Sequence, residues 1–199
     1  MPLIKLNNRS IKDVTSLPFG VGNLIHIQSQ TASNSASISF TTGINSTYKE
    51  YQFYFINIGS RTDAVSFQFN MSTDSGSNYN VTKTSTSFIT FHNEADTNTS
   101  LSYSTSFDLA QSTAYQILSG TDLGNVSDEN LSGSMSLFNP SSTTYVKHFI
   151  SVTNNNTYND YCASGYVAGY GNTTSAINAV RFQMSSGNFD GTIAMFGVL

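Results

Sequence analysis

The residues best suited to recognise a ligand are the tyrosines and amides of one segment, NNNTYNDYCASGYVAGY (154–170). Tyrosine rings offer flat apolar faces with a polar tip, and asparagine side chains both donate and accept hydrogen bonds, so this mixture suits a sugar or a protein partner. The alternative is that alternate tyrosines pack inward and the asparagines at 154–156 form a turn. The candidate contacts with a glycan or a partner protein are Tyr158, Asn159, Tyr161 and Tyr166.

Paired carboxylates could support glycoside hydrolysis, which needs two carboxyl groups at a suitable separation. The candidate pairs are Glu94 with Asp96 (HNEAD) and Asp128 with Glu129 (SDEN). Both pairs fall in polar loops, where solvated carboxylates are expected, and the chain has no Trp to form a sugar platform. A glycan-degrading enzyme that uses Glu94 or Glu129 is therefore the least favoured hypothesis, and we predict that the protein is not an enzyme.

Histidine, cysteine and aspartate positions do not form a catalytic or metal-binding motif. His26, His92 and His148 each lie in a strand pattern with apolar neighbours, which predicts half-exposed strand residues. The single cysteine, Cys162, excludes an intrachain disulfide and a cysteine-rich zinc site, and we expect it to be a small packed residue. The segment DSGSN (74–78) lacks the terminal Glu of a calcium loop and predicts a hairpin turn. We expect no cofactor and no metal.

The composition describes a neutral polar surface over an aromatic core. Only 10% of the 199 residues are charged, against about 25% in an average domain, whereas 76 are Ser, Thr or Asn. The net charge of −4 comes without the basic surface that nucleic-acid binding requires. No apolar run reaches the ~18 residues of a membrane span, and the first residues lack the pattern of a signal peptide. We therefore expect neither membrane insertion nor export.

Apolar residues that alternate with polar ones predict most of the secondary structure. In residues 64–70 (AVSFQFN), Val65, Phe67 and Phe69 share one face, as in a half-buried strand. Residues 49–58 (KEYQFYFINI) are aromatic on both faces, which indicates a central strand. Many short strands separated by turn residues predict an all-β fold, an antiparallel β-sandwich that is jelly-roll-like. Further strands are expected at 24–28, 36–40, 87–92, 134–138, 145–152, 166–170, 179–184 and 192–198.

Two segments depart from this strand pattern. Residues 107–118 could form a helix with Asp108 as its N-terminal cap. Residues 1–19 hold two of the three prolines and three of the eight cations, which predicts an extended N-terminal arm before a single β-sandwich domain at 20–199. The candidate anchoring residues of this arm are Lys5, Arg9 and Lys12.

Four stretches carry a resemblance to a known group of proteins. They are ISFTTGINSTYKEYQF (38–53), STDSGSNYNVT (72–82), FNPSSTTYVKHF (138–149) and INAVRFQMSSGNFDGTIAMFGV (177–198). Together they resemble small virion structural proteins of tailed bacteriophages, especially marine ones, that are often described as tail-fibre-like or head-fibre proteins. The C-terminal stretch resembles them most, with a strand, Ser-Gly-Asn, Gly-Thr-Ile and a final strand that ends in Phe-Gly-Val. The resemblance implies no catalytic residue.

The leading hypothesis is a non-enzymatic bacteriophage structural protein, a fibre, knob or capsid decoration subunit on the virion surface. The resemblance implies assembly in the host cytoplasm, attachment of the arm to capsid or tail proteins, and contact with the host surface, including its glycans. It also implies a homo-oligomer, most often a trimer, which would cover exposed sheet edges. The alternative is a carbohydrate-binding, lectin-like receptor-binding module that uses the tyrosine-rich segment.

Overall fold

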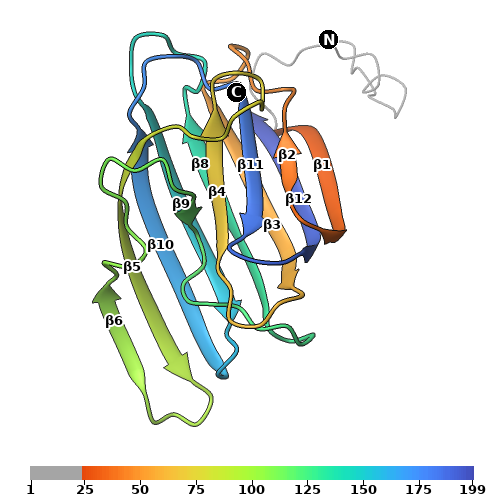
Figure 1. Cartoon of the computed structure of the whole chain (residues 1–199), viewed down its shortest axis with the longest axis vertical. Helices are drawn as coiled ribbons and strands as arrows, with labels where there is room; N and C mark the ends of the chain where they lie inside the picture. Colours follow the sequence, from red (N-terminus) through yellow and green to blue (C-terminus); the bar gives the residue numbers. More distant parts are fainter. Residues whose placement is uncertain (1–23) are drawn as a thin grey trace, which may run out of the picture.

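The computed structural model describes residues 24–199, which form two antiparallel sheets packed face to face (Figure 1). The eight-stranded sheet contains, in spatial order, β1 (Leu24–Ser35), β12 (Phe189–Val198), β3 (Glu50–Ser60), β8 (Asn130–Phe138), β9 (Lys147–Asn156), β10 (Tyr161–Gly171), β5 (Lys83–Asn93) and β6 (Thr99–Tyr103). The four-stranded sheet contains β2 (Ile38–Phe40), β11 (Ala179–Met184), β4 (Phe67–Ser72) and β7 (Gln116–Ile117). The predicted arm at 1–19, with Lys5, Arg9 and Lys12, lies outside the described residues.

The predicted all-β antiparallel sandwich is confirmed. The chain crosses repeatedly between the sheets, since β1, β3 and β5 lie in the large sheet and β2 and β4 in the small one, which gives the expected jelly-roll-like alternation. The strand at 49–58 is central, because β3 pairs with β12 on one side and β8 on the other. In the described part of the chain no helix has the length and apolar character of a membrane span.

Phenylalanine side chains fill the space between the sheets. Phe182 of β11 is fully buried, and its ring centroid lies 5.3 Å from those of Phe53 and Phe55 on the facing strand β3. Phe182 also contacts Phe67 and Phe69 of the adjacent strand β4, with ring centroids 6.0 and 6.2 Å away. These pairs join the small sheet to the large one, so the aromatic content of the sequence does supply the core.

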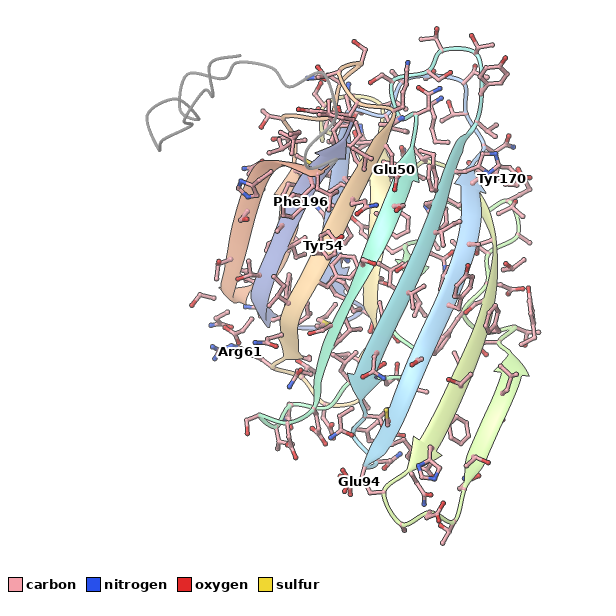
Figure 2. All side chains as sticks on the ribbon, turned by 180° about the vertical axis from the view of Figure 1, so that it is seen from behind. Glu50, Tyr54, Arg61, Glu94, Tyr170 and Phe196 are labelled. Atoms are coloured by element: carbon pink, nitrogen blue, oxygen red, sulfur yellow. The ribbon has the colours of Figure 1, made fainter. Side chains whose placement is uncertain are left out.

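The opposite face of the large sheet is not covered by the small sheet, and Figure 2 views the molecule from that side. Strand β9 alternates strictly: Phe149, Ser151 and Thr153 are buried, whereas Ile150 and Val152 between them are exposed. Such alternation arises because successive side chains of a strand point to opposite faces. In Figure 2, Tyr54, Phe196 and Tyr170 project from this outer face.

The small sheet covers only part of the inner face, and residues 104–123 cover a further part of it over β5 and β9. Figure 1 shows β2, β4 and β11 in front of β3, β8 and β12, whereas β10, β5 and β6 extend beyond them. There the backbone nitrogen of Ser85 donates to the carbonyl of Leu109 at 2.9 Å, and the Thr153 hydroxyl donates to the carbonyl of Leu118 at 2.6 Å. The 104–123 segment is therefore a packed loop that lies on β5 and β9.

The helix predicted at 107–118 is wrong, because this backbone forms its hydrogen bonds with neighbouring strands. Ser112 exchanges two hydrogen bonds with Lys83 of β5, and Gln111 has a positive φ of 49°, which a helix does not allow. Asp108 accepts a hydrogen bond from the Tyr103 hydroxyl at 2.5 Å and does not cap a helix. Gln116 lies in the short strand β7, which pairs with β4.

One further local expectation is wrong, and one strand was not expected. The asparagines at 154–156 belong to strand β9 and do not form a turn, since β9 continues to Asn156 in register with Cys162 of β10. Strand β6 was not predicted, although it pairs with β5 over five residues, because only two of its residues, Leu101 and Tyr103, are apolar. Polar residues can therefore belong to a strand when their backbone pairs with a neighbouring strand, even where no apolar pattern predicts one.

Candidate functional site

The tyrosine-rich segment is divided between the two faces of the molecule. Tyr158 and Asn159 lie in the turn between β9 and β10, Tyr161 is the first residue of β10, and Tyr166 lies within that strand. Because Tyr161 and Tyr166 are separated by five positions in one strand, their side chains point to opposite faces. Three of the four predicted contacts can therefore share a site, and Tyr166 cannot.

Tyr158, Asn159 and Tyr161 line a pocket of about 260 Å³, which we call the turn pocket. It opens where the β9–β10 turn meets the 104–123 loop and the inner side of β5. This volume lies just below the ~300–1,000 Å³ that is typical of small-molecule sites. Its lining residues are Phe91 from β5, Phe107, Thr121 and Asp122 from the 104–123 loop, and Thr157, Tyr158, Asn159 and Tyr161 from the turn.

Aromatic rings form the apolar part of the turn pocket. Phe91 and Tyr161 pack edge to face with ring centroids 5.2 Å apart, and the pairing of β5 with β10 sets this geometry. The Tyr161 hydroxyl accepts a hydrogen bond from Asn98 Nδ2 at 3.3 Å, which fixes the outer end of the ring. Tyr158 is 43% exposed at the mouth of the pocket, so its ring is free to contact a ligand.

Three oxygen-bearing side chains form the polar part. Thr157 is buried, and its Oγ1 accepts hydrogen bonds from the backbone nitrogens of Asn159 and Tyr161 at 3.3 and 3.2 Å. Asp122 Oδ1 accepts a hydrogen bond from the Ser66 hydroxyl. The Oγ1 atom of Thr121 is buried and has no hydrogen-bond partner within residues 24–199. The pocket thus combines flat apolar surfaces with hydroxyl and carboxylate groups.

Tyr166 belongs to a second feature, a row of exposed apolar residues across the outer face. It stacks on Phe88 of β5 with a centroid distance of 4.7 Å and an interplanar angle of 16°. Direct register pairs place Val152 of β9 beside Tyr166, and Tyr103 of β6 beside Phe88. We call these residues the outer row: Val152, Tyr166, Phe88 and Tyr103, which are 46%, 37%, 40% and 53% exposed.

The two carboxylate pairs considered for hydrolysis lie in two different loops, Glu94 with Asp96 between β5 and β6 and Asp128 with Glu129 before β8. Glu94 is exposed in the turn between β5 and β6, at the lower end of the molecule in Figure 2. Glu129 is buried in the loop before β8, where its Oε2 accepts a hydrogen bond from the backbone nitrogen of Val126 at 3.0 Å. Asp96 contacts His92 Nε2 at 2.9 Å on the surface. Glu129 and Asp96 therefore each have a local hydrogen-bond partner, and Glu94 is a solvent-exposed carboxylate.

The segment at 74–78 forms a turn, but the predicted hairpin is wrong, because this turn lies between β4 of the small sheet and β5 of the large sheet, which do not pair. Asp74 Oδ1 accepts hydrogen bonds from the Ser72 hydroxyl at 2.6 Å and from the backbone nitrogen of Asn78 at 2.9 Å, and its Oδ2 accepts one from Asn78 Nδ2 at 2.7 Å. These hydrogen bonds, led by that of Ser72, lower the pKa of Asp74 to about 2. The carboxylate therefore stabilises its own turn. Within residues 24–199 no cluster of three or more His, Cys, Asp or Glu could hold a metal ion.

The structure agrees with the expectation for the three histidines and contradicts the expectation for the cysteine. His26, His92 and His148 are exposed strand residues, close to the prediction for them. Cys162 is exposed, so the expectation of a packed residue is wrong. The reason is strand parity: Cys162 follows the inward-facing Tyr161 and so points to the outer face, where its Sγ lies 3.3 Å from Asn154 Nδ2.

Sequence reasoning did not identify Phe91, Phe107, Thr121, Asp122 or Thr157 as site residues. They reach the turn pocket only because β5 pairs with β10 and the 104–123 loop lies on the inner face. The alternation of the FITFH stretch could have indicated that Phe91 faces inward. Comparisons of this chain with protein-family models, curated proteins and solved structures found no match.

Proposed function

We propose that this protein is a non-enzymatic structural protein of a tailed bacteriophage, a β-sandwich fibre, knob or decoration subunit on the virion surface. The resemblance noted in the sequence supports this role, and its strongest stretch, 177–198, covers β11 and β12. β12 pairs with β1 and β3, and β11 pairs with β2 and β4, so this stretch lies centrally in both sheets.

The outer row is the observation that carries the proposal. A contiguous apolar patch on the surface of a soluble domain marks an interaction surface. Ile150 borders the row on one side and Leu101, which is 71% exposed, on the other. On a chain rich in hydroxyl and amide side chains, protein contact at this patch would bury apolar area from neighbouring strands.

A second copy of the chain is the partner that fits the outer row. The chain has a net charge of −4, so two copies repel each other wherever acidic residues meet. The row and its register neighbours, including Ala168, Thr86, Asn154 and Thr90, are uncharged, and the Asp108 carboxylate at the edge of the row accepts a hydrogen bond from the Tyr103 hydroxyl. Copies can therefore associate here through apolar and neutral polar contacts, and the resemblance favours a trimer.

The arm at 1–19 is proposed to attach the subunit to capsid or tail proteins through Lys5, Arg9 and Lys12. The test is to delete residues 1–19 in a phage that encodes this chain and to measure the subunit in purified particles. Loss from particles, with an unchanged circular dichroism spectrum of the purified variant, supports the anchor. Normal incorporation would overturn it, and an image of the intact particle would locate the subunit on head or tail.

A carbohydrate-binding, receptor-recognition role is the second candidate, and the turn pocket favours it. Three of the four residues selected from the sequence, Tyr158, Asn159 and Tyr161, line this pocket together with Phe91. Binding of the full chain to a glycan array, lost in Tyr158→Ala and Tyr161→Ala but kept in Tyr145→Ala, would support it. Tyr145 is a suitable control because it is exposed and does not line the pocket.

A further inference from the structure

We infer that the turn pocket binds one neutral sugar ring, whose hydroxyl groups contact Thr121, Asp122 and Thr157 and whose apolar face contacts Tyr158. This inference rests on the second proposed function, glycan binding, and adds to it the polar groups, the size and the charge of the ligand. Of these three polar residues, Thr157 belongs to the tyrosine-rich segment, whereas Thr121 and Asp122 come from the 104–123 loop.

The hydroxyl of Thr157 has a hydrogen left to donate. A threonine hydroxyl has one hydrogen and two acceptor sites. Both acceptor sites of Thr157 Oγ1 are used by the backbone nitrogens of Asn159 and Tyr161, at 3.3 and 3.2 Å. The side chain is 3% exposed, and within residues 24–199 its hydroxyl donates to no acceptor. A ligand oxygen in the pocket would receive this hydrogen.

Thr121 provides a second unsatisfied group in the same pocket. Its Oγ1 is buried from solvent and makes no hydrogen bond to any residue in the described range. Buried polar atoms are almost always hydrogen-bonded, because an unpaired one has lost its water without a replacement. Because this oxygen is closed to solvent, a ligand hydroxyl reaches it once the Thr121 side chain rotates about χ1 toward the pocket, and the hydroxyl then satisfies it as donor or acceptor.

Asp122 adds a charged acceptor and sets the charge of the ligand. Its Oδ1 accepts from Ser66, whereas Oδ2 accepts no hydrogen bond from residues 24–199, so one carboxylate oxygen is available for a ligand hydroxyl. The residues that line the pocket include this carboxylate but no Lys, Arg or His. An acidic sugar would therefore meet repulsion without a compensating cation, whereas a neutral sugar would not.

The aromatic residues and the volume restrict the ligand further. Phe91 and Tyr161 form one apolar wall, and the exposed ring of Tyr158 lies at the mouth, where it can cover the C–H face of a pyranose. A pocket of about 260 Å³ is small for a ligand site and leaves room for a single ring. We therefore expect recognition of a terminal sugar residue and not of a stretch within a polysaccharide chain.

The test is binding of methyl glycosides of glucose, galactose and mannose to the full chain, measured by saturation-transfer NMR and calorimetry, with glucuronic acid as the acidic comparison. We expect at least one neutral glycoside to bind and glucuronic acid not to bind. Thr121→Val keeps the shape and removes the hydroxyl, so it should weaken binding about tenfold, as expected for one lost hydrogen bond. Asp122→Asn should weaken it as well, whereas the matched surface variant Thr90→Val should not.

The possible results separate this inference from glycan binding in general. If glycans bind and binding is unchanged in Thr121→Val and Asp122→Asn but lost in Phe88→Ala, the sugar lies on the outer row and the inference is wrong. If glucuronic acid binds as tightly as the neutral glycosides, the charge argument is wrong. If neither the glycosides nor a glycan array shows binding, the proposed carbohydrate function itself is overturned. Thermal unfolding of Thr121→Val verifies folding, since removal of an unpaired buried hydroxyl should not lower stability.

Discussion

Gly120 of the 104–123 loop and Gly165 of β10 face each other without room for a side chain on either. A Cβ on Gly165 would lie 2.8 Å from the backbone nitrogen of Gly120 and 2.9 Å from its Cα. The same nitrogen donates to Asn155 Oδ1 at 3.1 Å, so loop and sheet are joined at backbone distance. Because Thr121 follows Gly120 directly, this contact positions the polar part of the turn pocket.

The substitution Gly165→Ala should therefore move the loop and lower stability. Three backbone atoms, in Gly120 and Leu118, would lie within 3 Å of the new methyl group, and such overpacking costs about 1–3 kcal/mol. Urea unfolding measures the loss, and amide NMR shifts of residues 118–122 would report the movement. Gly59→Ala is the matched control, since a Cβ there meets nothing within 4 Å. Equal stability of the two variants would contradict the close contact.

A second prediction concerns Phe182, the ring that contacts both sheets. Phe182→Ala should lower the free energy of unfolding by about 3–5 kcal/mol, as is usual for a buried Phe. It would remove contacts with Phe53 and Phe55 of the large sheet and with neighbours in the small one. Phe88→Ala on the outer face should cost much less, because Phe88 is 40% exposed. Similar losses in the two variants would contradict this description of the core.

The positions of most strands follow from the sequence because burial on one face imposes a period of two. Residues 179–184 were predicted with the bounds that β11 has, and Phe182 lies on its buried side. The same reasoning fails where hydrogen bonding, and not the burial of apolar side chains, determines whether a segment is a strand. Asn155 lies in β9 because its side chain points inward and accepts a hydrogen bond from Gly120, a contact between segments 35 positions apart.

The candidate site was predictable only in part for the same reason. The tyrosine-rich segment could be identified, but the strand was expected only at 166–170, so the opposite faces of Tyr161 and Tyr166 became evident only when β10 was found to begin at Tyr161. Phe107 and Asp122 could not be identified, because their loop was expected to contain a helix. Which distant residues complete a pocket depends on strand order, and no local pattern in this sequence determines that order.

A third prediction concerns Lys83, which is fully buried in β5. Its Nζ donates to Asn70 Oδ1 at 2.6 Å and to the carbonyl of Val81 at 2.8 Å, and no carboxylate contacts it within residues 24–199. Burial lowers its pKa from 10.5 to about 7. At a pH between these two pKa values, Lys83 is protonated in the unfolded chain and neutral in the folded chain. The free energy of unfolding should therefore rise with pH in this range.

The measurement is urea unfolding at pH 7, 8 and 9 for the wild type and for Lys83→Met. The wild type should gain roughly 1.4 kcal/mol per pH unit from this residue within that window. Burial also lowers the pKa of Lys147, so part of the rise will remain in the variant. The difference between the two pH profiles isolates Lys83, and parallel profiles would show that its amine titrates normally in the fold.

The fourth prediction tests whether the outer row joins copies of the chain. Phe88→Glu places a carboxylate between Tyr166 and Tyr103, its register partners, at the centre of the outer row. Association of a chain that already has a net charge of −4 should then be abolished, because each contact would bury a carboxylate against an apolar face. Sedimentation velocity at several concentrations measures this. Tyr145→Glu, which adds the same charge at an exposed position outside the row, should associate like the wild type. If the wild type sediments as a monomer at all concentrations, or if both variants behave alike, the outer row is not the contact between copies.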